Sequence, residues 1–272
     1  MANHNQKRHL SQFFTPQAVV EFMFDLVGFA PLWKVMDPAC GDGAFLKEAL
    51  RRGAAAVAGV DIDPEAIESA RENLQVFDGR YRLFCQDGLA DIESESGFWK
   101  EHYDLIIGNP PFASSKWRVR DKEILRHFTL AHTEDERNTL QLPLLGESIR
   151  PVKTRLSQVI EVLFLERFIQ LARPGGKVAI ILPEGVFANS NLRYVREWLV
   201  ESFTIRAVIG LPRETFKDMR TTAKTAILYL EKQKPPDGHQ VVLAELGQIN
   251  LNGGPNPELG AVVASLKSAK WC

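Results

Sequence analysis

Cysteine is scarce in this sequence, and neither sign of charge is in clear excess. The 272 residues include three cysteines, too few and too scattered for a disulfide framework or a zinc cluster. The 33 Lys and Arg residues are balanced by 34 Asp and Glu, so the total lacks the basic excess usual in nucleic-acid-binding proteins. No apolar run approaches the ~18 residues needed to span a bilayer, and no apolar core follows the basic N-terminal stretch. We therefore expect a cytoplasmic protein without a membrane segment. The six histidines have no metal-ligand spacing, so no metal site is expected.

Short apolar runs alternate with helical patterns along most of the chain. Strands are predicted at residues 34–37, 55–61, 81–86, 103–108, 177–182, 207–211 and 225–230. Helices are predicted between them, as at 158–172, where apolar side chains recur at helical spacing. Strands separated by helices favour a mostly parallel, doubly wound α/β sheet that is covered on both faces.

Two stretches interrupt this alternation. Residues 113–157 contain no clear strand, and an irregular insertion of this length inside a compact domain is usually functional or mobile. Residues 233–272 begin with a linker-like segment and then offer one further strand at 241–246. We therefore predict a main domain at 1–232 and a short C-terminal extension at 233–272.

A loop of small residues, DPACGDGAF at 37–45, follows the first predicted strand. In doubly wound sheets, ligands bind beyond the carboxyl ends of the strands, where glycine permits close approach of the backbone. The loop is not a GxGxxG, and its carboxylates, Asp37 and Asp42, disfavour phosphate but suit an ammonium or sulfonium group. These features indicate an amino-acid-bearing nucleoside such as S-adenosylmethionine. A plain strand-to-helix turn is the alternative.

Acidic residues also end the second and third predicted strands. Asp61 stands roughly 20 residues after the glycine loop, where a carboxylate can accept hydrogen bonds from both ribose hydroxyls. The following Ile62 can pack against an adenine face. Asp87, followed by Gly88, can accept a hydrogen bond from the amino group of adenine. The alternatives are that Asp61 and Asp63 cap the next helix and that Asp87 and Gly88 form an ordinary turn.

The segment Asn109-Pro110-Pro111-Phe112 directly follows the fourth predicted strand. Two consecutive prolines hold the backbone extended, which fixes the Asn109 amide oxygen and the Pro110 carbonyl as two acceptors. Two acceptors can hold and polarise an exocyclic amino group, and Phe112 offers a ring for stacking a planar base. A base bound in this way must leave its double helix. The alternative is a proline-rich turn with a core phenylalanine.

These four motifs, in this order, resemble those of gamma-class DNA adenine-N6 methyltransferases, in particular the modification subunits of type I restriction–modification systems. The FFTP segment at 13–16 looks like that family's N-terminal motif, and residues 216–232 are similar to the strand pair that ends its catalytic domain. The resemblance covers about residues 10–232. It implies a Rossmann-like fold of S-adenosylmethionine-dependent methyltransferases, with a seven-stranded, mostly parallel sheet and a reversed strand near the C-terminus.

The resemblance also implies a role for individual residues. The cofactor site would comprise Phe14, Thr15, Pro16, Asp37, Ala39, Gly41, Phe45, Asp61, Ile62, Asp87, Gly88 and Asn109. Asn109, Pro110 and Phe112 would hold the target adenine, and Phe216 would stack on its other side, although a core role fits Phe216 equally well. Direct transfer of the methyl group to the amino nitrogen needs no covalent enzyme intermediate, so catalysis is mainly positioning and electrostatics.

The resemblance further implies partners. Enzymes of this kind act on double-stranded DNA and read it with a target-recognition domain or a separate specificity subunit, for which residues 233–272 are too short. We therefore expect 1–232 to be the catalytic domain and 233–272 to be the start of a missing or truncated region. A specificity subunit and a restriction nuclease are the expected protein partners.

Three other functions fit parts of the same pattern. Methyltransferases of protein glutamine or ribosomal RNA carry close variants of the NPPF segment, although the FFTP start argues against them. A non-catalytic module that binds S-adenosylmethionine or DNA within a larger complex is a second alternative. A nicotinamide-dependent oxidoreductase is disfavoured, because the loop at 37–45 lacks a GxGxxG.

Overall fold

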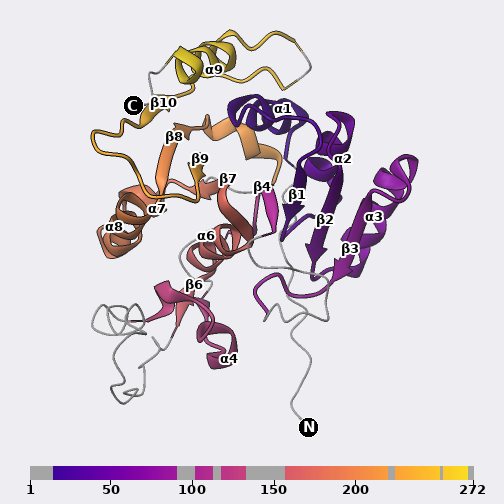
Figure 1. The fold of residues 1–272 in the computed structure, drawn as a ribbon, viewed down its shortest axis with the longest axis horizontal. Helices are drawn as coiled ribbons and strands as arrows, with labels where there is room; N and C mark the ends of the chain where they lie inside the picture. Colours follow the sequence, from indigo (N-terminus) through magenta and orange to yellow (C-terminus); the bar gives the residue numbers. More distant parts are fainter. Residues whose placement is uncertain are drawn as a thin grey trace.

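An eight-stranded sheet forms the centre of the fold (Figure 1). The computed structural model describes residues 15–90, 102–112, 118–132, 157–219, 224–251 and 254–268. In chain order the strands are β1 (Lys34–Asp37), β2 (Ala56–Asp61), β3 (Tyr81–Cys85), β4 (Tyr103–Gly108), β7 (Ala172–Pro183), β8 (Thr204–Gly210), β9 (Thr225–Glu231) and β10 (Val242–Glu245). Their spatial order is β10-β8-β9-β7-β4-β1-β2-β3.

All strands of this sheet run in one direction except β9. Strands β3, β2, β1, β4 and β7 pair in parallel, whereas β9 is antiparallel to both of its neighbours, β7 and β8. The expected Rossmann-like sheet with a reversed strand near the C-terminus is confirmed. It has one strand more than the expected seven, because β10 of the C-terminal segment pairs in parallel with β8.

Helices cover both faces of the sheet, as the apolar runs of its strands require. One face packs against α1 (Gln17–Leu26), α2 (Ala44–Arg51), α3 (Pro64–Leu74) and α9 (Pro257–Ser268). The other face packs against α6 (Ile160–Leu171), α7 (Gly185–Ala188) and α8 (Arg193–Ser202). Successive strand residues alternate between the two cores, as Val35 and Met36 do in β1.

Local sequence explains why helices α2 and α3 begin where they do. Asp63 caps α3 by accepting the backbone N–H of Glu65, and Pro64 occupies the first helical turn, where it needs no N–H donor. Gly43 precedes α2 with φ of +80°, a conformation that favours glycine. A Cβ at this position would lie 3.2 Å from the Cβ of Ala70, so glycine also permits the close packing of α2 on α3.

The described part of the 113–157 insertion contains short elements that the sequence did not predict. Strand β5 (Arg118–Val119) pairs antiparallel with β6 (Gln158–Val159), and α4 (Lys122–Leu125) and a 3-10 turn, η2 (Thr129–Ala131), follow β5. Apolar residues of α4 and η2 pack into the core beside α6. The remaining residues of the insertion, 113–117 and 133–156, lie outside the described residues.

The C-terminal segment is packed onto the sheet and onto α1. Its helix α9 contributes Leu259 and Leu266 to the core that α1 and α2 share. The remaining short elements are the 3-10 turns η1 (Gln75–Phe77), η3 (Ser190–Leu192) and η4 (Arg213–Met219). Within the described ranges, no helix is both long enough and apolar enough to cross a membrane.

Candidate functional site

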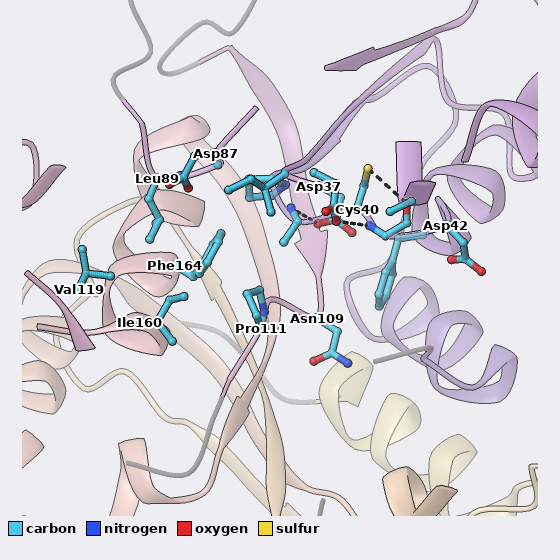
Figure 2. A pocket seen from close by; sticks show the side chains of 18 of the residues that line it. Asp37, Cys40, Asp42, Asp87, Leu89, Asn109, Pro111, Val119, Ile160 and Phe164 are labelled. Atoms are coloured by element: carbon cyan, nitrogen blue, oxygen red, sulfur yellow. Dashed lines mark hydrogen bonds between the residues drawn. The ribbon is translucent and has the colours of Figure 1, made fainter. Parts of the chain in front are cut away.

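A cavity of about 620 Å³ opens beyond the carboxyl ends of β1, β2, β3 and β4. The loops that follow these four strands carry the four sequence motifs, so the parallel sheet brings all four to one edge. Ten predicted site residues line the cavity: Thr15, Asp37, Ala39, Gly41, Phe45, Asp61, Ile62, Asp87, Gly88 and Asn109. Figure 2 shows Asp37 and Asp42 on one side of this space and Val119, Ile160 and Phe164 on the other, with Asp87 beside Leu89.

Asp37, at the end of β1, is the most buried carboxylate of the cavity, with 1% of its surface exposed. Its Oδ1 accepts the backbone N–H of Ala39 at 3.0 Å. Burial, with smaller contributions from the negative charges of Asp61 and Asp42, raises the pKa of Asp37 to about 8. Gly108 in the adjacent β4 makes room for this side chain, because a Cβ there would overlap the Asp37 carboxylate.

Asp61 joins the end of β2 to the glycine loop. Its two oxygens accept the backbone N–H groups of Gly41 and Asp63, each at 2.9 Å, which fixes the carboxylate at the cavity wall. Asp42 accepts the N–H of Ala44 at the start of α2. Burial raises the pKa of both Asp61 and Asp42. Three partly desolvated carboxylates in one cavity favour a cationic ligand.

Asp87 and Gly88 form a tight turn after β3. Asp87 accepts the backbone N–H of Leu89 through Oδ1 at 2.9 Å, and its carbonyl accepts the N–H of Ala90 at 3.0 Å. A Cβ at Gly88 would overlap the carbonyl oxygen of Pro38. Glycine at position 88 therefore lets this turn lie directly against the loop that follows Asp37.

Asn109 follows β4 and is 9% exposed. Its Nδ2 donates to the hydroxyl of Thr15 at 3.2 Å, which links the end of β4 to the residues that precede α1. Its Oδ1 is buried and has no hydrogen-bond partner among the described residues. A buried acceptor without a partner costs about 1–3 kcal/mol, so this oxygen is suited to a ligand that supplies an N–H or O–H.

The apolar side of the cavity comes from residues that the motifs did not identify. Leu89 follows the turn at Asp87, Val119 ends β5, and Ile160 and Phe164 project from α6 (Figure 2). The helical spacing at 158–172 predicted α6 but not which of its residues reach the cavity. Arg118 and Arg120, from the insertion, also line the cavity.

Four other predicted residues are not part of this cavity lining, and one is not described. Pro16 directly precedes α1 and Pro110 follows Asn109, but neither is a lining residue. Phe112 and Phe216 are 4% and 2% exposed and lie in the same core, beside α1. Phe14 lies outside the described residues. No group of His, Cys, Asp or Glu that could hold a metal ion occurs in the ranges searched, which are the described ones.

Comparisons with known proteins find similar DNA methylases. The type I restriction enzyme MjaIX methylase subunit of Methanocaldococcus jannaschii is 21% identical over 82% of this chain and 38% of that subunit. The type II methyltransferase M.AccI of Acinetobacter calcoaceticus is 26% identical over 80% of this chain and 36% of that enzyme. The chain thus spans less than half the length of these curated relatives.

Solved structures show the same fold. The type I restriction–modification methyltransferase subunit of Streptococcus thermophilus superposes with a TM-score of 0.71 at 20% identity, covering 95% of this chain and 55% of that one. A class I S-adenosylmethionine-dependent methyltransferase of Listeria monocytogenes, itself of inferred function, gives a TM-score of 0.63 at 22% identity, covering 97% of this chain and 73% of that one. The family model described as N-6 DNA Methylase matches residues 1–252. Since this match includes nearly the whole chain, the protein belongs to the N-6 DNA methylase family.

Proposed function

We propose that this chain is the catalytic part of a DNA adenine-N6 methyltransferase of a restriction–modification system, with S-adenosylmethionine as methyl donor. Family membership supports this proposal, and the observation that carries it is the Asn109 amide. Its nitrogen is engaged by Thr15, and its buried oxygen lacks a partner among the described residues. An exocyclic amino group supplies the N–H donor that this oxygen lacks.

The cavity fits S-adenosylmethionine in size and in charge. A volume of about 620 Å³ lies within the usual range for small-molecule sites. Asp37 is the group proposed to hold the cationic amino-acid end, with Thr15 beside it, and Asp61 is proposed to accept the ribose hydroxyls. Asp87, Ile62 and the apolar side of the cavity are proposed to hold adenine. Bound there, the cofactor would supply an electrophilic methyl group.

The chain's own contribution to the reaction is to hold the target amino group. We assign the Asn109 Oδ1 and the Pro110 carbonyl as its two acceptors. Accepting both N–H groups increases electron density on nitrogen and directs its lone pair toward the cofactor side of the cavity. Phe112 is assigned to stacking on the flipped adenine, and Phe216 to its other face. Both rings are buried in the core of this structure, so these two roles require them to become exposed when DNA binds.

The proposed partners are double-stranded DNA, a specificity subunit or target-recognition domain, and a restriction nuclease. A net charge of −1 suits a catalytic part that holds the cofactor and the flipped base while other protein surface contacts most phosphates. Because DNA is the proposed substrate, we place the protein in the cytoplasm.

Substitution of Asn109 tests the proposal. Wild-type chain, Asn109→Ala and the exposed control Asn191→Ala are first titrated with S-adenosylmethionine by calorimetry. Each is then incubated with labelled cofactor and duplex DNA, and N6-methyladenine is measured by mass spectrometry of the digested DNA. Asn109→Ala is expected to lower methylation by about 10²–10³-fold, because it removes one preorganised polar contact to the reacting group. Its cofactor binding is expected to weaken far less, because the carboxylates of Asp37, Asp61 and Asp87 remain in the cavity.

Three results would contradict the proposal. Wild-type protein that does not bind S-adenosylmethionine would remove the cofactor assignment. Label in ribosomal RNA or protein glutamine, with none in DNA, would change the substrate class. Full methylation by Asn109→Ala would remove the assigned role of Asn109.

A further inference from the structure

The largest fully buried side chain in the described part of the protein is an arginine, Arg167 on α6. One terminal nitrogen, Nη2, donates to the carbonyl of Leu89 at 3.0 Å and to the carbonyl of Ala90 at 3.1 Å. The guanidinium carbon lies 4.8 Å from the ring centre of Phe128. Burial of a guanidinium is costly unless its hydrogen bonds and charge are compensated, so this position calls for a specific explanation.

The two carbonyls belong to the turn that carries Asp87. Within this turn the Asp87 carboxylate accepts the N–H of Leu89, and the Asp87 carbonyl accepts the N–H of Ala90. Gly88 presses against the Pro38 carbonyl on one side of the turn, and Arg167 binds the Leu89 and Ala90 carbonyls. The turn is therefore fixed by a backbone contact and by a charged side chain from a different layer of the fold.

The same helix supplies the apolar side of the cavity. Ile160 and Phe164 line the cavity, and Arg167 lies on the same face of α6, since residues three and four apart in a helix are neighbours. The adjacent Glu166 accepts the N–H groups of Thr129 and Leu130 and so holds η2 against α6. One helix thus connects the turn at 87–90, η2 and the apolar side of the cavity.

We propose that Arg167 is a positioning residue for the nucleoside end of the cofactor site: it holds the 87–90 turn so that Asp87 and Leu89 face the cavity. This inference rests on the proposed function, because it assigns adenine and ribose to that end of the cavity. Arg167 itself does not line the cavity and touches neither cofactor nor substrate.

Binding of a nucleoside fragment separates this role from a general effect on stability. The probes are 5′-methylthioadenosine, which contains only the nucleoside half, and S-adenosylmethionine, both titrated by calorimetry. Arg167→Lys keeps the charge but lacks the planar guanidinium, and Arg167→Met removes the charge at similar length. Arg193→Lys is the control, since that arginine is 77% exposed on α8.

Both Arg167 variants are expected to bind 5′-methylthioadenosine and S-adenosylmethionine about tenfold more weakly, by the same factor for each, which corresponds to the loss of one hydrogen bond to adenine. Arg193→Lys is expected to bind both like the wild type. In turnover, KM for the cofactor is expected to rise in Arg167→Lys with kcat retained. Asp37→Asn provides the contrast: it is expected to weaken binding of S-adenosylmethionine and to leave binding of 5′-methylthioadenosine unchanged.

Unchanged affinity of Arg167→Lys for 5′-methylthioadenosine would overturn the inference, and so would a loss confined to S-adenosylmethionine. Thermal melts establish that each variant is folded at the assay temperature. If Arg167→Met is not folded, Arg167→Lys decides the question. A wild-type chain that binds neither probe would instead refute the proposed function, so the two failures are distinguishable.

Discussion

Replacing Asp37 by asparagine is expected to make the ligand-free protein more stable, and increasingly so as pH rises. Asparagine has the same shape and can still accept the N–H of Ala39 through its oxygen. It removes a carboxyl group whose pKa is raised by burial from 3.8 to about 8. Between those two pH values the folded wild type holds a proton that the unfolded chain releases.

The sign and size of the effect follow from this difference in proton binding. Below about pH 4 the carboxyl group is protonated in both the folded and the unfolded wild type, so Asp37 does not lower the free energy of unfolding there. As pH rises from 4 toward 8, the unfolded chain alone releases the proton, and the free energy of unfolding falls. Each pH unit in this interval costs the wild type about 1.4 kcal/mol relative to Asp37→Asn. At pH 7 the interval above 3.8 is about three units, so the variant is expected to be more stable by roughly 4 kcal/mol.

Urea unfolding at pH 5, 6, 7 and 8, followed by circular dichroism, measures this difference. The exposed Asp78→Asn serves as the control and is expected to follow the wild type at every pH. A stability difference that is the same at pH 5 and pH 8 would refute the reasoning, because it would mean that Asp37 is already ionised in the folded protein at pH 5. S-adenosylmethionine binding is expected to change in the opposite direction. An ammonium group beside Asp37 favours the ionised carboxylate in the wild type, whereas asparagine cannot ionise.

Two further predictions concern Thr15 and the C-terminal segment. Thr15→Val is expected to lower kcat for DNA methylation about tenfold, because it removes the hydroxyl that accepts from the Asn109 Nδ2. Thr15→Ser keeps the hydroxyl and is expected to keep kcat. Equal kcat in the two variants would rule out a role for this hydrogen bond. Leu259→Ala on α9 is expected to lower the free energy of unfolding by about 2 kcal/mol, because Leu259 packs in the core shared with α1. Leu243→Ala is the control and is expected to change this free energy little, because Leu243 on β10 is 75% exposed. Urea unfolding that gives the same loss for both leucine variants would show that α9 is not part of the cooperative fold.

The motifs at strand ends could be located from the sequence because parallel strands bring their carboxyl ends to one edge. Asp37, Asp61, Asp87 and Asn109 lie at or just after the ends of four separate strands and meet at one cavity. The resemblance implies that Gly88 contacts the cofactor, and the structure also shows a packing reason for glycine there, the close contact with the Pro38 carbonyl. Such contacts join residues far apart in the chain and leave no local pattern.

The apolar side of the cavity could not be predicted for the same reason. Ile160 and Phe164 look like ordinary core residues of an apolar helix, and only its packing against the sheet decides which of them reach the cavity. Arg167 stands next to Glu166 within that helix, and nothing in its sequence neighbourhood indicates the carbonyls that it binds. The burial of Phe112 and Phe216 was likewise not evident, since an aromatic ring after a strand is compatible with a core or a stacking role.

The packing of Gly108 against Asp37 makes the two positions interdependent during sequence change. The atoms that a Cβ at position 108 would meet first all belong to the Asp37 side chain. A side chain at position 108 therefore clashes with Asp37, and shortening that side chain removes these nearest clashes. The energetic effects of substituting Gly108 and of shortening Asp37 should not add, because shortening Asp37 removes the atoms with which a side chain at position 108 clashes. A lineage that replaces Asp37 by a shorter residue removes this obstacle at position 108, and regaining aspartate after a side chain has appeared there requires glycine to return first.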